Sequence, residues 1–195
     1  MFPAFMSLTI FITSSKRFVF LFLNDELRKS LLPSPVAYCL SKNYLCAMQQ
    51  LNFPAYQFRF KNSENKVAIF DEIRKKFMVL TPEEWVRQHV VQYLLQEKKY
   101  PKSYINVEKL IKLNGLVKRY DVVVFQPDGK LFLLIECKST NIKISQDTFD
   151  QIARYNMALE SKYLMVTNGL NHYFCQMDYA EEKYNFLQEL PEFSI

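Results

Sequence analysis

Two acidic residues and a lysine lie near the ends of two short apolar runs that are joined by a turn sequence. Asp121 is in the first run, and Glu136 and Lys138 end the second. Asp128-Gly129 between two apolar runs is typical of a β-hairpin with a two-residue turn. Such a turn sets a register in which Asp121 faces Glu136 directly, and Lys138 shares their face of the hairpin.

Two carboxylates that face each other on apolar strands repel, and they destabilise the hairpin unless a cation offsets their charge. A divalent cation is a natural partner, because hard cations bind carboxylate oxygens. The alternative is a plain salt bridge from Glu136 to Lys138 or Lys118, without a metal. Both strands are otherwise apolar on both faces, as central strands of a covered sheet are. This favours a metal site that contains Asp121 and Glu136.

A helix is expected before this hairpin. Thr81 is the predicted N-cap, Pro82 takes the first helical position, and Glu84 completes a capping box. On a helical wheel Glu83 shares the side of the buried valines, so we expect it to be the acid that faces the site. The alternative is that Glu83 only pairs with Arg87, four residues on.

The other expected elements surround this centre. They are an N-terminal hairpin (56–60 and 67–70, with a turn at 61–65), a strand at 105–113, a helix that carries Gln151 and Tyr155, strands at 163–167 and 173–177, and a short C-terminal helix. This order predicts one α/β (α+β) domain over residues 48–195. Its mixed central sheet is flanked by helices, and the N-terminal hairpin is an addition to it.

Residues 1–47 have a different character. They carry a net charge of +3 of the chain's +5, lack a clear helical period, and contain the helix-breaking Pro33 and Pro35. We expect a poorly packed extension, and a natural start at Met48 would explain it. The alternative is a weak targeting segment or a membrane-surface anchor, although its apolar runs are too short to span a bilayer.

The cysteines and histidines exclude one class of site. Four cysteines without a C-x-x-C pair and two distant histidines do not make a structural zinc site. We interpret the thiols as free in a reducing compartment, which predicts a cytoplasmic protein. No run of 18 or more apolar residues exists, so stable membrane association is not expected. Cys137 alternates with its charged neighbours and is expected to be buried.

Asp121 followed by Glu136-Cys137-Lys138 resembles the D…(D/E)-x-K motif of the PD-(D/E)XK nuclease superfamily, and Gln151 with Tyr155 resembles its Q-x-x-x-Y element. The amino-acid sequence is also similar to that of the N-terminal nuclease domain of type I restriction enzyme R subunits. That similarity covers about residues 48–193 and is carried by the segments 80–88, 118–124, 134–139, 151–156 and 166–173.

The resemblance implies a restriction-endonuclease-like core and a Mg²⁺-dependent DNA endonuclease, with Mn²⁺ as a substitute metal. The implied metal ligands are Asp121, Glu136, the carbonyl of Cys137, and Glu83. Lys138 would orient the attacking water or stabilise charge in the transition state. Gln151 and Tyr155 would hold Lys138, the metal-bound waters or a DNA phosphate in place.

One feature of R subunits is missing. The sequence has no G-x-x-x-x-G-K-[ST] phosphate loop and is too short for a helicase motor. DNA is the expected partner, bound mainly through its phosphates, and protein partners would supply a motor or sequence specificity. Two alternatives stay open: a catalytically silent DNA-binding or assembly module on the same fold, and a nuclease subunit that is active only with partner chains.

Overall fold

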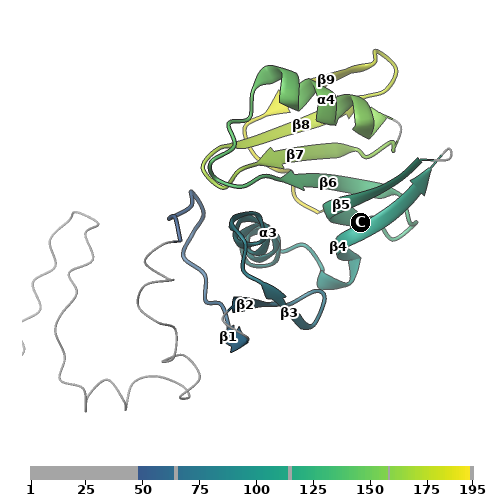
Figure 1. The fold of residues 1–195 in the computed structure, drawn as a ribbon. Coiled ribbons are helices and arrows are strands. Elements are labelled where there is room, and N and C mark those ends of the chain that lie inside the picture. The colour runs from purple at the N-terminus through teal and green to yellow at the C-terminus, as the bar shows by residue number, and fades with distance from the viewer. Residues whose placement is uncertain (1–47, 64–65, 114–115, 158, 194–195) are drawn as a thin grey trace, which may run out of the picture. The chain divides into compact units, whose positions relative to one another are not determined.

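The computed structural model of the chain describes residues 48–63, 66–113, 116–157 and 159–193 (Figure 1). The predicted extension over residues 1–47, and the boundary that separates it from the domain, lie outside the described residues. Within the described ranges the chain forms a small antiparallel sheet, a larger mixed sheet and two α-helices.

The small sheet has the strand order β1-β2-β3, with β1 at Phe60–Ser63, β2 at Lys66–Asp71 and β3 at Lys76–Val79. The large sheet has the order β4-β5-β6-β7-β8-β9. Its strands are β4 (Ile105–Leu113), β5 (Leu116–Phe125), β6 (Leu131–Cys137), β7 (Tyr163–Thr167), β8 (His172–Asp178) and β9 (Lys183–Leu187). Strands β6 and β7 are parallel and the other neighbours are antiparallel, so the predicted mixed α+β sheet is confirmed.

Helices cover both faces of the large sheet. Helix α3 (Pro82–Gln92) continues into a π-helical turn at Tyr93–Glu97, and a 3₁₀ turn at Lys102–Tyr104 leads into β4. Helix α4 (Gln146–Met157) makes the crossover between β6 and β7. Val122 and Ile135 pack in the core beneath α3, whereas their strand neighbours Val123 and Leu134 pack beneath α4. Alternation along β5 and β6 therefore builds two cores, one on each face.

The N-terminus of α3 is capped as the sequence predicts, but the capping box is not formed. The Thr81 hydroxyl accepts a hydrogen bond from the backbone N–H of Glu84, at 3.0 Å. The Glu84 carboxylate, however, points into the protein and pairs with Arg74 and Arg87. The predicted capping role of the Glu84 side chain is therefore wrong, because the guanidinium groups of Arg74 and Arg87 compete for it.

The turn of the β5–β6 hairpin also differs from the prediction. The N–H of Gln126 bonds to the carbonyl of Lys130 at 2.8 Å, and Gly129 has a φ of 85°. These features define a three-residue loop that ends in a left-handed glycine, and not the predicted two-residue turn. A register shift after Phe125 leaves Phe132 as an extra residue on β6. This bulge restores the expected pairing, so Val122 still faces Ile135.

Two further expectations at the ends of the domain need correction. The predicted first strand at 56–60 and the predicted turn at 61–65 are both placed too early, because β1 is Phe60–Ser63 and residues 56–59 are not in a strand. Strand β3 also adds a third strand to the expected hairpin. The predicted C-terminal helix is wrong, because β9 occupies that part of the chain. The rings of Tyr184 and Phe186 pack against Phe149 with centroids 5.0 and 5.1 Å apart, which favours an extended strand over the end of α4.

Candidate functional site

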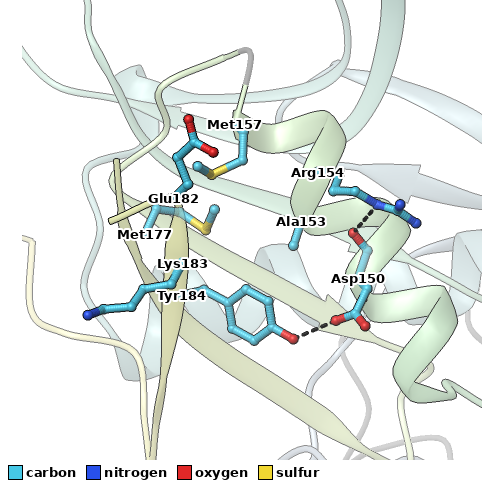
Figure 2. Close-up of a pocket in the computed structure, with 8 residues that line it drawn as sticks. All are labelled: Asp150, Ala153, Arg154, Met157, Met177, Glu182, Lys183 and Tyr184. Carbon is cyan, nitrogen blue, oxygen red and sulfur yellow. Dashed lines mark hydrogen bonds between the residues drawn. The ribbon is translucent and has the colours of Figure 1, made fainter. Parts of the chain in front are cut away.

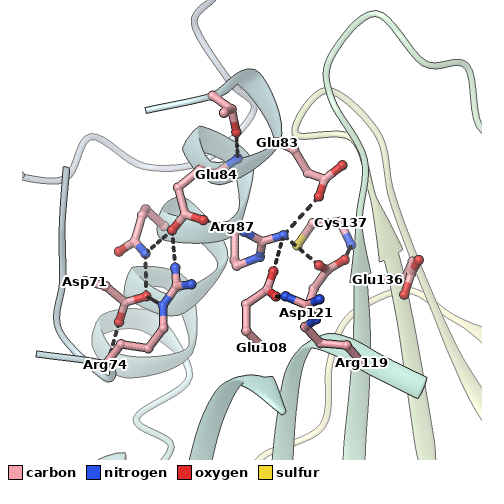
Figure 3. Close-up of polar contacts among 12 residues, drawn as sticks. Asp71, Arg74, Glu83, Glu84, Arg87, Glu108, Arg119, Asp121, Glu136 and Cys137 are labelled. Atoms are coloured by element: carbon pink, nitrogen blue, oxygen red, sulfur yellow. Dashed lines mark hydrogen bonds and ion pairs between the residues drawn. The ribbon is translucent and has the colours of Figure 1, made fainter. Parts of the chain in front are cut away.

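Arg87 on α3 brings three carboxylates from different elements together (Figure 3). Its side chain is only 6 % exposed. The Nη2 atom lies 2.7 Å from Oδ1 of Asp121 on β5, 2.9 Å from Oε1 of Glu83 and 3.0 Å from Oε1 of Glu108 on β4. The helix and both strands of the β4–β5 hairpin therefore meet at one guanidinium group.

The Nη2 atom of this guanidinium group has fewer hydrogens than there are acids around it. An Nη atom carries two hydrogens, and those of Nη2 are directed to Glu83 and Asp121. Glu108 lies at ion-pair distance from the same nitrogen but receives no hydrogen bond from it. The buried Nε of Arg87 has no hydrogen-bond partner among the described residues. This cluster therefore holds more negative charge than Arg87 can satisfy.

Asp121 and Glu136 occupy neighbouring strands but have different partners. The second oxygen of Asp121 accepts a hydrogen bond from the backbone N–H of Cys137, at 2.7 Å. Glu136 pairs with Lys138, with Oε1 and Nζ 2.8 Å apart. The observed register, extended by one residue beyond Val122 and Ile135, places Asp121 opposite Glu136. No contact in the described part of the chain joins the two carboxylates, so a shared ion stays a prediction.

The backbone around Glu108 is unusual. Glu108 has a φ of 54°, which is strained for a residue with a side chain. Its position is opposite Asp121, between the pairs formed by Val107 with Val122 and by residues 109 with 120. Val122 packs beneath α3, but Tyr120, two residues earlier, packs beneath α4. The alternation of β5 therefore breaks at Asp121, where both carboxylates reach Arg87.

The ion pairs of Arg87 continue into a second group of residues, which is buried between α3 and the small sheet. Asp71 accepts hydrogen bonds from Nε of Arg74 and from the Gln88 amide, at 2.7 and 2.8 Å. Gln88 also donates to Glu84, and Arg74 pairs with Glu84 on its other side. Glu84 itself links this group to Arg87. This group joins the small sheet to α3.

The surroundings shift the pKa of several members. Burial raises the pKa of Glu83, and the nearby Asp121 carboxylate raises it further. Burial alone would lower the pKa of Lys138, but the hydrogen bond to Glu136 and the charges of Asp121 and Glu83 raise it above its usual value. For Asp71, burial opposes ionisation, and the hydrogen bonds from Arg74 outweigh it, so that the pKa lies below the ordinary range. Lys138 therefore carries its charge at neutral pH.

The charges of the whole group are unequal. Its members are the acids Asp71, Glu83, Glu84, Glu108, Asp121 and Glu136, and the cations Arg74, Arg87, Arg119 and Lys138. When all are ionised, six negative charges stand against four positive ones. The excess of two negative charges equals the charge of one divalent cation.

The donor chemistry fits such an ion, but the arrangement does not. Carboxylate oxygens are suitable ligands for Mg²⁺. Among the described residues, however, no three His, Cys, Asp or Glu side chains are grouped so that they could hold one metal ion. Arg87 and the Cys137 N–H hold Asp121, and Lys138 holds Glu136. The predicted metal ligands Asp121, Glu136, Cys137 and Glu83 thus lie in one part of the structure, but they do not form a metal site there.

The predicted Q-x-x-x-Y residues are on α4. Gln151 is exposed, and no described contact connects it with Lys138. Tyr155 belongs to the helix, but its side chain lies outside the described part of the structure. A pocket also borders α4, between the helix and the β8–β9 hairpin (Figure 2). None of the predicted site residues is among those that line it: Asp150, Ala153, Arg154, Met157, Met177, Glu182, Lys183 and Tyr184.

Cys137 is fully buried in the core beneath α3, as the sequence predicts. Burial raises the pKa of its thiol well above the ordinary value, and the Asp121 charge adds to this. A thiol that stays protonated is a poor nucleophile. The contribution of Cys137 to the site is its backbone N–H, which orients Asp121.

Two members of the site are not predicted as such from the sequence. Arg87 is expected only as a partner of Glu83, and Glu108 is not expected to take part. One signal could have found Glu108, since Asn114-Gly115 is typical of a two-residue hairpin turn. That turn sets a register in which Glu108 faces Asp121. No local pattern predicts that Arg87 reaches both of them.

Comparison with protein families identifies the chain. Residues 82–191, more than half of its length, match the model of the type I restriction enzyme R protein N terminus (HSDR_N). The chain belongs to this family. The match begins at α3, so it includes every acid around Arg87 and excludes the small sheet. No curated protein matches the chain.

Two solved structures are similar to parts of the chain. A fragment assigned as an HsdR subunit of a type I restriction enzyme from Vibrio vulnificus YJ016 is 22% identical over 59% of this chain, with a TM-score of 0.42. The chain covers only 24% of that protein fragment. A protein assigned as a nuclease of DUF820 from Anabaena variabilis ATCC 29413 is 12% identical, with 70% of this chain and 80% of that chain covered and a TM-score of 0.38.

In the part of the chain that the structure describes, none of the helices combines the length and the apolar character needed to cross a membrane.

Proposed function

We propose that this protein is a Mg²⁺-dependent DNA endonuclease that hydrolyses phosphodiester bonds. The observation that carries the proposal is the position of Asp121, within β5, opposite Glu136 near the end of β6, where Lys138 pairs with Glu136, inside a type I restriction R-protein N-terminal domain. Perturbed, charge-coupled groups of this kind are common at catalytic sites. The pKa of Lys138, raised by three carboxylates around it, supports a permanently charged catalytic lysine.

Each residue has a distinct part in this proposal. Lys138 would hold its positive charge where negative charge develops on the scissile phosphate. Asp121 and Glu136 supply the carboxylates, and the Cys137 N–H orients Asp121. A bound divalent cation would supply Lewis acidity and a lowered pKa of its bound water. Gln151 and Tyr155 are proposed to position Lys138 or a phosphate once DNA is bound.

The β4–β5 hairpin supports DNA as the substrate. Only residues 122–125 of β5 pair with β6, so the outer part of the hairpin is a two-stranded ribbon beyond the edge of β6. Residues 109–119 contain four basic residues and no acid. Lys109 is exposed, and Arg119 is 65% exposed. The ribbon begins at Asp121. A DNA backbone bound along the basic side chains of the ribbon would therefore run past the acids of the site. Contacts of this type carry no sequence information, so we expect sequence-independent binding.

A partner-dependent role is also consistent with the relatives. The similar HsdR fragment comes from a subunit of a type I restriction enzyme, and the present chain covers about a quarter of it. We therefore propose that other chains supply translocation or sequence choice. One observation favours the silent alternative, a DNA-binding module without cleavage: Arg87 already occupies Asp121 in the structure.

Cleavage by the full-length protein decides between these functions. Supercoiled plasmid and single-stranded DNA would be incubated with the protein in Mg²⁺, in Mn²⁺ and in EDTA. We expect nicking in either metal, none in EDTA, and none with Glu136→Gln. Glu182→Gln, at an exposed position near the pocket beside α4, is the matched control and should cleave like the wild type. DNA binding without cleavage in any metal would instead support the silent module.

A further inference from the structure

Arg87 occupies the place where the proposed nuclease would need its cation. Its Nη2 atom is hydrogen-bonded to Asp121, the acid that the metal would share with Glu136. The three acids around that atom cannot all receive one of its two hydrogens. A guanidinium group neutralises one charge there, whereas a divalent cation would neutralise two.

Arg87 also has a second anchor that does not depend on Asp121. Its Nη1 atom pairs with Glu84, whose side chain is 5% exposed and which Arg74 and Gln88 hold in place. The Nη2 end lies toward the more open acids, since Glu83 is 46% exposed and Glu108 is 23% exposed. A pivot of the whole rigid guanidinium group about its Nη1–Glu84 contact would therefore release Asp121 while the pair with Glu84 is kept.

We propose that Arg87 is an exchangeable internal counter-ion of the acid cluster. A divalent cation binds at Asp121 only when the ion pair between Arg87 and Asp121 opens, and Arg87 closes on Asp121 again when the cation leaves. Arg87 is then a positioning residue that keeps the acids from repelling one another in the cation-free protein. This inference rests on the proposed function, because it concerns the cation that the nuclease would use.

The exchange explains two features together. It accounts for an aspartate whose two oxygens both accept hydrogen bonds from the protein itself. It also accounts for three acids placed around one nitrogen of Arg87, which has a hydrogen for only two of them. The expected consequence is weak cation binding, because each binding event must first break an existing ion pair.

Binding of Mn²⁺ to the full-length protein, followed by electron paramagnetic resonance, tests the exchange without using activity. Arg87→Met should bind Mn²⁺ about tenfold more tightly than the wild type, because Asp121 is already free. Asp121→Asn should lose the binding. Arg59→Met is the control, since Arg59 is 63% exposed and pairs with Glu72 and not with an acid of the cluster. Its Mn²⁺ affinity should stay close to that of the wild type.

Unchanged or weaker Mn²⁺ binding by a folded Arg87→Met would overturn the exchange and leave the proposed nuclease intact. Absence of Mn²⁺ binding in both the wild type and Arg87→Met would overturn the metal requirement as well. A second measurement covers the case in which Arg87→Met does not fold. In wild-type protein labelled at arginine nitrogen, the guanidinium resonance of Arg87 should shift during a Mg²⁺ titration, and that of Arg74 should not. A constant Arg87 signal at saturating Mg²⁺ would contradict the proposal.

Discussion

Glu83 and Glu84 are neighbours in the first turn of α3, yet their carboxylates belong to two different environments. Glu84 is 5% exposed and lies among Arg74, Arg87 and Gln88. Glu83 is 46% exposed, shares Arg87 with Asp121, and has a raised pKa. Adjacent residues of one helical turn therefore belong to a closed set of ion pairs and to an open one (Figure 3).

The closed set is balanced in charge. Asp71 and Glu84 stand against Arg74 and Arg87, and Gln88 donates to both acids. The open set contains the acids Glu83, Glu108, Asp121 and Glu136. Its own cations are Arg119 and Lys138. Ion pairs that stabilise a fold need complete neutralisation, because an unpaired buried charge is costly. An excess of negative charge instead suits a site that binds a divalent cation, and Glu83 in the open set is 46% exposed to solvent.

The closed set should dominate stability. Asp71→Asn removes one of the two charged partners of Arg74 and weakens the acceptor of the Gln88 amide. Breaking a buried pair by removal of one partner costs about 3–5 kcal/mol. We expect a loss of this size in the free energy of unfolding, measured with urea. The control is Asp128→Asn at the exposed hairpin turn, which should unfold close to the wild type. Equal stability of both variants would remove the distinction between the two sets.

The same aspartate predicts a dependence on pH. The pKa of Asp71 is lower in the folded protein than its ordinary value near 3.8. A depressed pKa means that the ionised aspartate stabilises the fold above that ordinary value, and that this contribution disappears as the pH falls through the folded-state pKa. The difference in unfolding free energy between wild type and Asp71→Asn should therefore be constant near neutral pH and shrink below about pH 4. Urea unfolding at a series of pH values measures it.

The open set should instead affect the reaction. Lys138→Ala removes the cation closest to Glu136, and we expect the rate of plasmid nicking to fall about 10²–10³-fold, the effect of losing one charge-stabilising donor. Mn²⁺ affinity should change much less, since Lys138 acts on the reacting phosphate. An equal loss of the nicking rate and of Mn²⁺ affinity would give Lys138 a structural role. It would also weaken the distinction between Lys138 in the open set and Arg74 in the closed set.

The basic ribbon extends the open set toward DNA. The double variant Lys109→Gln with Arg119→Gln should reduce the slope of log affinity against log salt by about 0.9 for each phosphate that is no longer neutralised. Ca²⁺ in place of Mg²⁺ would suppress cleavage during the titration. Lys130→Gln with Lys183→Gln, at exposed positions on other hairpins, is the matched control. An equal slope for both double variants would place the DNA on another surface.

Local patterns predict the elements better than they predict these two charge sets. The Asp121–Glu136 register survives an incorrect turn prediction, because the extra residue at Phe132 offsets the longer loop. The cap at Thr81 is likewise a local signal that the structure keeps. The position of the Glu84 carboxylate is not local, since it depends on guanidinium groups that arrive from the small sheet and from the next turn of α3.

The C-terminal strand shows the same limit. Residues 178–182 include three acids and suggest the end of the sheet, but the aromatic residues after them extend as β9 because α4 offers Phe149 as a packing surface. A helix and a strand are both compatible with such a short segment, and tertiary packing decides between them. Tertiary packing also decides the partners of Arg87, since they come from three separate elements.

The smallest expected effect concerns the strained residue of the open set. Glu108 has a φ of 54°, a conformation that glycine adopts readily and alanine does not. Glu108→Gly and Glu108→Ala both lose the carboxylate, so their difference isolates the backbone. The glycine variant should be the more stable by about 1 kcal/mol in urea unfolding. At Lys109, the next residue of the strand, the same pair of substitutions should have the opposite order, because glycine weakens regular strands. If alanine is as stable as glycine at position 108, the backbone there is unstrained in solution, and the break in strand alternation at Asp121 needs another cause.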